Sequence, residues 1–185
     1  MKIYTRGGDK GRTSIQGKRV SKDDIQIECL GVLDEAVVSI GLLRSKLEAS
    51  HAWQENLKKI QSDLMDIMGY MAVPKDKALP PEQLPINGAE FFEKWIDELE
   101  ESLSSPSEYF ILPGGTETEA LCHLARVLVR KGERTLIALN NEEPVEEWIL
   151  AYINRLSDLF YTLSRVDLDQ NKISEDRWKL FINKK

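Results

Sequence analysis

The sequence predicts an all-α fold, an up-and-down bundle of about five helices. Apolar residues recur at helical spacing in separate stretches, strand-like sequence is scarce, and several stretches are joined by short connections. The 185 residues suffice for one domain with a sizeable core. We therefore predict a single domain over residues 1–185, with an N-terminal loop at 1–22 and a helical bundle with a C-terminal tail at 23–185.

The first two helices are predicted from apolar residues that recur every three or four positions. The first begins after Asp23 or Asp24, either of which can cap it. Two glycines inside it, Gly31 and Gly41, indicate the close approach of another backbone. A second helix is expected over residues 52–71. The apolar positions are Leu30, Leu33, Val37, Ile40 and Leu47, then Leu57, Ile60, Leu64, Ile67 and Met71, with Met65 and Met68 as adaptable core filler.

The second half of the chain holds three more long helices. Prolines between residues 73 and 88 indicate a surface connection, after which a third helix spans 91–103. Thr116 and Glu119 match a capping box that starts the fourth helix, and Pro144 near the first position opens the fifth. Residues 174–176 are expected to cap a last short helix that carries Trp178 and Phe181. The expected core positions are Phe91, Phe92, Trp95, Leu99 and Leu103, then Leu121, Leu124, Leu128 and Leu139, then Ile149, Ile153, Leu156, Leu159, Phe160 and Leu163.

Composition argues against several classes of function. The net charge is −6 and the pI is about 5.1, so neither a nucleic-acid partner nor an anionic membrane is expected. No apolar run approaches the ~18 residues of a membrane-spanning helix, and the start lacks the apolar segment of a signal peptide. We therefore expect a cytoplasmic protein. The cysteines (Cys29, Cys122) and histidines (His51, His123) have no metal-ligand spacing.

Residues 5–14 form a short segment rich in glycine, cations and hydroxyl groups. Its glycines leave backbone N–H groups bare, and its side chains add positive charge and further donors. A polyphosphate suits this combination, although the segment is neither a P-loop nor a dinucleotide fingerprint. The alternative is a flexible tail with turn residues. The residues are Thr5, Arg6, Gly7, Gly8, Asp9, Lys10, Gly11, Arg12, Thr13 and Ser14, and Lys18, Arg19 and Lys22 continue the basic character.

Three further features stand out on the predicted helices and the turn before the fourth. Arginines at four-residue spacing form a stripe on the fourth helix, polar residues one turn apart lie on the fifth, and a phenylalanine precedes a Pro-Gly-Gly turn. Taken singly, each has a plain explanation as a solvated helix face, a surface residue or a packing anchor. The residues are Arg126, Arg130, Lys131 and Arg134, then Asn154 and Asp158, and Phe110.

Several motifs occur in an order and at separations that match one known family. Residues 5–13 look like its signature T-[RK]-x-G-D-x-G-x-[TS]. The others are Ser21-Lys22-Asp23-Asp24, Glu28-x-x-Gly31-x-x-Asp34-Glu35 with Ile40-Gly41, Phe110-x-Leu112-Pro113-Gly114-Gly115, Ala125-Arg126-x-x-x-Arg130-x-x-Glu133-Arg134 and Asn154-Arg155-Leu156-Ser157-Asp158-Leu159. The chain thereby resembles the PduO-type ATP:cob(I)alamin adenosyltransferases over most of residues 2–165. The resemblance implies a ferritin-like, cobalamin adenosyltransferase-like bundle that assembles as a homotrimer with active sites between subunits.

The resemblance also implies transfer of the 5′-deoxyadenosyl group from ATP to cob(I)alamin, giving adenosylcobalamin and tripolyphosphate. It implies that Arg130 is catalytic, that Asp34 and Arg126 pair across the interface, and that Phe110 presses on the lower face of the corrin. Mg²⁺ is expected on the phosphates without direct protein ligands. A reductase and an adenosylcobalamin-dependent enzyme are further expected partners. The implied ATP-binding residues are Thr5, Arg6, Gly7, Gly8, Asp9, Lys10, Thr13, Ser14 and Lys22 from one subunit, and Arg130, Lys131, Glu133, Arg134 and Asn154 from its neighbour.

This chemistry needs no protein nucleophile, because Co(I) attacks C5′ and the site only has to stabilise the departing tripolyphosphate. Three departures from the family pattern bear on affinity and stability. Gly7 replaces a common hydroxyl or amide residue, Lys131 replaces an arginine, and Gly132 replaces an alanine. One alternative is a non-catalytic ATP or corrinoid sensor or carrier, which the retained arginine motif disfavours. Another is a structural helical oligomer, which leaves the glycine-rich loop unexplained.

Overall fold

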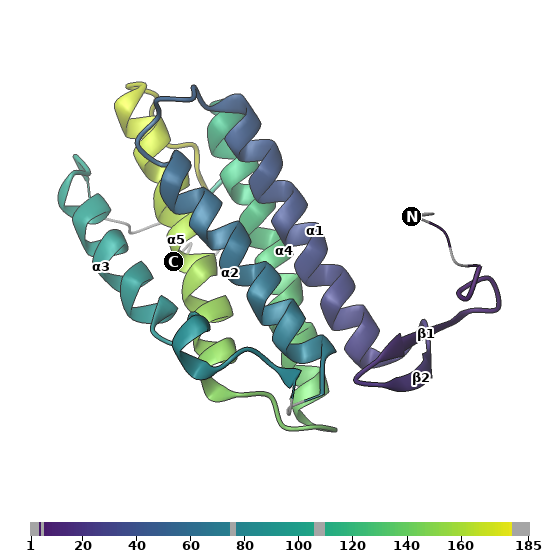
Figure 1. Ribbon diagram of the computed structural model, residues 1–185. Coiled ribbons are helices and arrows are strands. Elements are labelled where there is room, and N and C mark those ends of the chain that lie inside the picture. Colours follow the sequence, from purple (N-terminus) through teal and green to yellow (C-terminus); the bar gives the residue numbers. More distant parts are fainter. Residues whose placement is uncertain (1–3, 5, 75–76, 106–109, 179–185) are drawn as a thin grey trace, which may run out of the picture.

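The computed structural model describes residues 4, 6–74, 77–105 and 110–178. Within that part the chain forms five α-helices, which confirms the predicted all-α bundle. Figure 1 shows the helices running side by side along a common direction. Helix α4 packs against both α1 and α5, while α2 packs on α1 and α3 packs on α5. The helices are α1 (Ile25–Lys46), α2 (Gln54–Ala72), α3 (Gly88–Glu101), α4 (Glu117–Asn140) and α5 (Glu147–Gln170), with a short 3₁₀ helix, η2 (Pro81–Gln83), before α3.

The predicted caps explain where α1 and α4 begin. The Asp24 side chain accepts a hydrogen bond from the Gln26 N–H at 2.9 Å, and the Thr116 hydroxyl accepts one from the Glu119 N–H at 2.9 Å. The capping box is nevertheless only half formed. The Glu119 carboxylate turns away from the Thr116 N–H and accepts hydrogen bonds from the two glycines before it, a contact that becomes important at the site.

The core lies between the helices, and every core residue predicted for α5 is buried. The predicted burial is wrong for two residues: Leu124 is 39% exposed and Met65 is 54% exposed. The side of α4 that faces the core is instead lined by Cys122, Ala125, Val129 and Leu136. The prediction counted only large apolar residues, whereas small ones let α4 approach its neighbours closely.

The glycines within helices behave differently from one another. A Cβ at Gly132 would lie 3.2 Å from the Leu33 Cδ2 atom, so this glycine lets α4 pack tightly on α1. A Cβ at Gly41 would lie 3.1 Å from the Gln61 Nε2 atom, so this glycine faces a side chain rather than another backbone. A Cβ at Gly31 would have no neighbour within 4 Å, so the predicted close approach there is wrong within a single chain.

Two predictions at segment ends are also wrong. Helix α5 begins at Glu147, and Pro144 lies in the connection, where the next amide, that of Val145, donates to the Asn140 side chain at 2.8 Å. The expected last helix is absent over the described residues. Instead β4 (Arg177–Trp178) pairs antiparallel with β3 (Phe110–Ile111). Phe181 lies outside the described residues.

A β-hairpin connects the N-terminal loop to the bundle. Strands β1 (Arg12–Ile15) and β2 (Lys18–Ser21) are joined by Gln16 and Gly17, both with positive φ. The Gln16 backbone N–H donates to the Ala72 carbonyl at 2.9 Å and its side chain to the Met71 carbonyl at 3.0 Å, which fixes the hairpin to the end of α2. Among the described residues no helix has the length and apolarity to cross a membrane.

Candidate functional site

The N-terminal loop is shaped by hydrogen bonds within its own hairpin. The Arg19 side chain donates to the Gly7 carbonyl at 2.8 Å, the Gly11 N–H to the Gly8 carbonyl at 3.2 Å, and the Lys22 N–H to the Gly11 carbonyl at 2.9 Å. Gly11 has a φ of 71°, which a glycine adopts without strain. The loop therefore has a defined path over the described residues; Thr5, the first predicted ligand, lies outside them.

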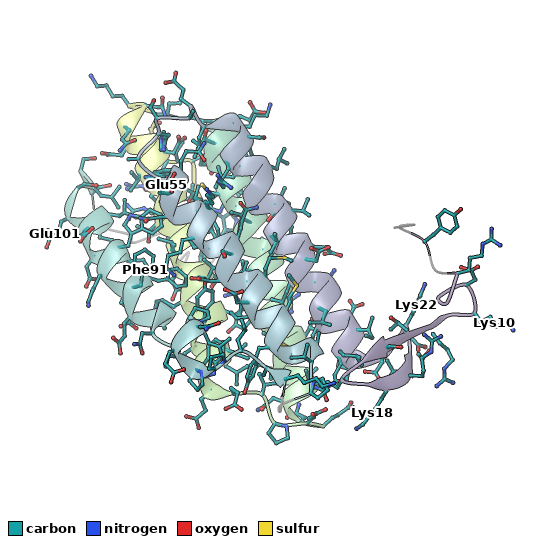
Figure 2. The ribbon with its side chains drawn as sticks, viewed as in Figure 1. Lys10, Lys18, Lys22, Glu55, Phe91 and Glu101 are labelled. Atoms are coloured by element: carbon teal, nitrogen blue, oxygen red, sulfur yellow. The ribbon has the colours of Figure 1, made fainter. Side chains whose placement is uncertain are left out.

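Cationic side chains gather on this N-terminal segment. Figure 2 labels Lys10 and Lys22 at the outer part of this segment, and Lys18 nearer the end of the bundle. A Cβ at Gly8 would lie 3.2 Å from the Lys22 Nζ atom, so the missing side chain lets the ammonium group approach the loop backbone. The other predicted ligands here are exposed or half-buried: Arg6, Gly7, Asp9, Thr13 and Ser14.

Beside the arginine stripe, α4 contacts the polar side of α5 through Glu133. Arg130 and Arg134 are exposed. The Asn154 amide of α5 donates to the Glu133 carboxylate of α4 at 2.7 Å, so two predicted ATP ligands meet across the two helices. Lys131 pairs with Glu35 of α1 at 2.9 Å, so its charge is directed towards α1. The cations of the stripe therefore lie next to other polar groups, namely the Glu133–Asn154 pair and Glu35, and are not isolated.

Arg126 differs from the other arginines because it is half-buried. Burial lowers the pKa of its guanidinium, and the neighbouring Arg130 charge lowers it further. Its Nε donates to His123 Nδ1 at 3.2 Å. The predicted partner, Asp34, lies exposed on α1, and the structure of one chain does not bring the two together.

Phe110 is 65% exposed, so the packing-anchor reading does not fit the structure. It lies on β3, directly before the turn into α4, and its ring stands 6.4 Å from that of Trp178 on β4. The Leu112 N–H donates to the Asp176 carbonyl at 2.8 Å and extends the strand pairing. An exposed aromatic side chain held on a short strand can lie flat against a large apolar ligand.

Sequence reasoning missed three residues near these groups. The sequence pattern predicts a helix at Trp178 and gives no sign that this side chain lies beside Phe110. The pattern offers His123 no metal-ligand spacing and gives Glu119 only a capping role. Both are buried, with His123 in contact with Arg126 and Glu119 in contact with His123. No signal in the sequence distinguishes them from ordinary helix residues, because burial depends on the packing of α4 against α5. Over the described residues no group of three or more metal-ligating side chains occurs.

The two basic features are separated within one chain. Figure 1 shows the segment before β1 extending away from the bundle, whereas the arginine stripe lies on α4. A ligand that contacts both features must therefore meet them on different chains, or after a rearrangement.

Comparisons with known proteins agree on one family. A sequence profile described as cobalamin adenosyltransferase matches residues 3–167. The corrinoid adenosyltransferase of Bacillus subtilis is 36% identical over 170 residues, covering 90% of this chain and 86% of that protein. Human corrinoid adenosyltransferase MMAB is 35% identical, covering 89% and 68%. A phenylalanine-to-alanine variant of the PduO-type ATP:corrinoid adenosyltransferase from Lactobacillus reuteri, complexed with cobalamin and ATP, is 30% identical with a TM-score of 0.86, covering 97% and 100%.

Proposed function

The chain belongs to the cobalamin adenosyltransferase family, and we propose that it transfers the 5′-deoxyadenosyl group of ATP to cob(I)alamin. The products are adenosylcobalamin and tripolyphosphate. One observation carries the assignment of the site: α4 presents exposed Arg130 and, together with α5, the Glu133–Asn154 pair, while the strand leading into α4 presents exposed Phe110. Helices α4 and α5 thus supply groups for a polyphosphate and its nucleoside, and the strand before α4 supplies an aromatic side chain for a corrin.

The reaction needs stabilisation of charge rather than a protein nucleophile. The cobalt of the substrate supplies the electron pair, the cobalt–C5′ bond forms, and the bond from C5′ to the phosphate oxygen breaks. Negative charge then grows on the tripolyphosphate. We assign its stabilisation to Arg130 and Arg134, with Mg²⁺ carried on the phosphates. Glu133 orients Asn154, leaving the Asn154 carbonyl free to accept from the nucleoside.

The N-terminal loop supplies the other side of the polyphosphate site in this proposal. Its exposed Arg6 and Lys10 and the Lys22 ammonium near Gly8 gather positive charge on an otherwise acidic protein. Because the loop extends away from its own bundle, it is suited to reach a neighbouring subunit. The assigned ligands are Thr5, Arg6, Gly7, Gly8, Asp9, Lys10, Thr13, Ser14 and Lys22.

The proposed homotrimer is supported by the outer face of α1. Gly31, Asp34, Val38 and Leu42 recur every three or four residues and share that face. Val38 is 65% exposed and Leu42 is 43% exposed, and Gly31 leaves open space above the helix. An apolar face with an open glycine suits another helix, and Asp34 would there meet Arg126 of the neighbouring subunit.

Phe110 is assigned to the lower face of the corrin. An apolar side chain at that position excludes water and the base that would otherwise coordinate cobalt from below. Without a lower ligand, Co(II) accepts an electron more readily. A reductase that supplies the electron and an enzyme that uses adenosylcobalamin are the partners that this chemistry requires.

The test is anaerobic incubation of the protein with MgATP and chemically reduced cobalamin, following the absorbance of Co(I). The proposal predicts that this absorbance disappears only when both protein and ATP are present. Tight ATP binding without loss of Co(I) would instead support the sensor or carrier.

A further inference from the structure

We infer that Glu119 and His123 are positioning residues. Together they fix the position of the turn after Phe110 relative to the Arg126 side chain. This inference rests on the proposed function, which places Phe110 at the corrin and Arg126 at the subunit interface. Glu119 is fully buried and His123 is 4% exposed. A carboxylate buried to this degree is costly unless it has polar partners, and the partners that it has connect the two halves of the proposed site.

On one side, Glu119 fixes the backbone of the turn between β3 and α4. Its Oε2 atom accepts the N–H of Gly114 at 2.9 Å and that of Gly115 at 3.2 Å. A Cβ at Gly115 would lie 2.5 Å from the Leu168 Cδ2 atom, so the turn is also wedged against α5. Since Phe110 stands only four residues before Gly114, this contact limits where its ring can lie.

On the other side, the carboxylate meets His123. The Glu119 Oε1 and His123 Nε2 atoms lie 3.0 Å apart. Their alignment falls short of a straight hydrogen bond, and neither atom has another hydrogen-bond partner over the described residues. His123 Nδ1 accepts from the Arg126 Nε at 3.2 Å. A guanidinium only donates, so Nδ1 must be unprotonated and Nε2 must carry the proton that faces Glu119.

The three side chains therefore lie in one sequence of polar contacts: Arg126 donates to His123 Nδ1, and the proton on His123 Nε2 faces the Glu119 carboxylate. Burial lowers the pKa of His123, and Arg126 adds to this against the opposing effect of Glu119. The Tyr161 ring of α5 packs edge-on against the His123 imidazole, with the two ring centroids 6.1 Å apart. A protonated or flipped imidazole would lose its contact with Arg126, and the guanidinium would then leave the position from which it is proposed to meet Asp34 of the neighbouring subunit.

Substitutions can reverse or preserve the order of donors and acceptors from Arg126 through His123 to Glu119. In Glu119→Gln the carbonyl still accepts from the two glycines, so the amide N–H₂ must face His123 Nε2. The imidazole proton then moves to Nδ1, and Arg126 loses its acceptor. His123→Gln keeps a donor for Glu119 and an acceptor for Arg126, whereas His123→Phe keeps the shape and removes both. Glu117→Gln is the matched control, because Glu117 lies exposed in the same turn and pairs with Lys46 at 2.8 Å, away from His123 and Arg126.

The first measurement is ¹⁵N NMR of the histidine side chains in the protein without substrates. We expect the Nε2–H tautomer for His123 in the wild type and in Glu117→Gln, and the Nδ1–H tautomer in Glu119→Gln. An Nδ1–H tautomer in the wild type, or no change in Glu119→Gln, would overturn the inference. This result does not depend on activity, so it stands apart from any failure of the proposed function.

The second measurement compares the variants in ATP affinity and in the spectrum of bound cob(II)alamin. Glu119→Gln and His123→Phe should raise the Kd for ATP about tenfold, because a displaced Arg126 no longer holds the subunit interface on which the ATP site is built, and should lower the fraction of four-coordinate Co(II). His123→Gln should recover both values. Equal impairment of His123→Gln and His123→Phe would show a purely structural role. Wild-type values in His123→Phe would also reject the inference.

Discussion

The side-chain amide of Asn154 donates to the carboxylate of Glu133 at 2.7 Å, and this contact joins α5 to α4 at the arginine stripe. Both residues are at the surface, so the contact contributes little to stability. It does, however, fix which edge of the amide faces outward. An amide oriented by a carboxylate presents its carbonyl oxygen to a ligand, which suits recognition of a nucleoside.

Glu133→Ala tests whether that orientation matters. The freed Asn154 amide can rotate, so we expect the KM for ATP to rise about tenfold, by roughly the energy of one hydrogen bond, with little change in melting temperature. Steady-state kinetics at saturating cob(I)alamin would measure it. Glu142→Ala, at an exposed position just beyond α4, is the control and should behave as the wild type. An unchanged KM in Glu133→Ala would remove Glu133 from the site.

Arg130→Ala tests the charge on the departing tripolyphosphate. Arg130 is exposed in the free chain, so its loss should leave the fold intact. Turnover should fall by about 10²-fold or more, the usual effect of removing one oriented donor from developing negative charge. Arg130→Lys should retain part of the activity because it keeps the charge but loses the planar fork. Near-normal turnover of Arg130→Ala would argue against the assignment.

Asp34→Asn tests the proposed contact between subunits. Removing one partner of a charge pair leaves Arg126 uncompensated at the interface. The trimer of the variant should therefore dissociate at a higher protein concentration than that of the wild type. Sedimentation velocity over a concentration series measures this. Glu35→Gln is a matched control, because Glu35 is the next residue and pairs within the chain with Lys131. A wild type that is monomeric at micromolar concentration would contradict the proposed assembly.

Phe110→Ala tests the corrin contact. The residue is 65% exposed, so truncation should cost the fold little. With MgATP present, bound cob(II)alamin should be four-coordinate in the wild type and five-coordinate in the variant. ATP affinity should be unchanged, and the loss of activity should be greater from cob(II)alamin than from ready-made cob(I)alamin. The same four-coordinate fraction in both proteins would reject the role.

The pKa of His123 gives a prediction for stability against pH. Burial lowers this pKa below its ordinary value of 6.5. The unfolded chain therefore binds the proton at a higher pH than the folded chain, and stability is lost as the pH falls through 6.5. The melting temperature of the wild type should drop more than that of His123→Gln between about pH 7.5 and 5.5. Parallel curves would indicate that His123 titrates normally.

Much of the fold was predictable because helical periodicity and local capping act over a few residues. The core of α5 and the caps at Asp24 and Thr116 followed directly. The errors came from longer-range contacts. Leu124 is exposed because small residues line the core side of α4, and Trp178 forms a strand because β3 offers it a backbone edge.

The site was predicted from motif resemblance more than from physics. Periodicity placed the arginines of α4 on one stripe and Asn154 on a polar side, and the structure brings Glu133 and Asn154 together. Periodicity could not show that Arg126 is half-buried while the other arginines of α4 are exposed. That difference in exposure depends on the burial of His123 and Glu119 between helices. Nor could periodicity show that the N-terminal loop extends away from its own bundle.

The most direct test of the proposed function identifies both products of one reaction. Protein, MgATP and cob(I)alamin are mixed without oxygen, the corrinoid is followed by its absorbance, and the phosphates are followed by ³¹P NMR. The account predicts adenosylcobalamin and tripolyphosphate in equal amounts, and neither product from Arg130→Ala on the same timescale. Release of ADP and phosphate, or unchanged Co(I) beside bound ATP, would contradict it.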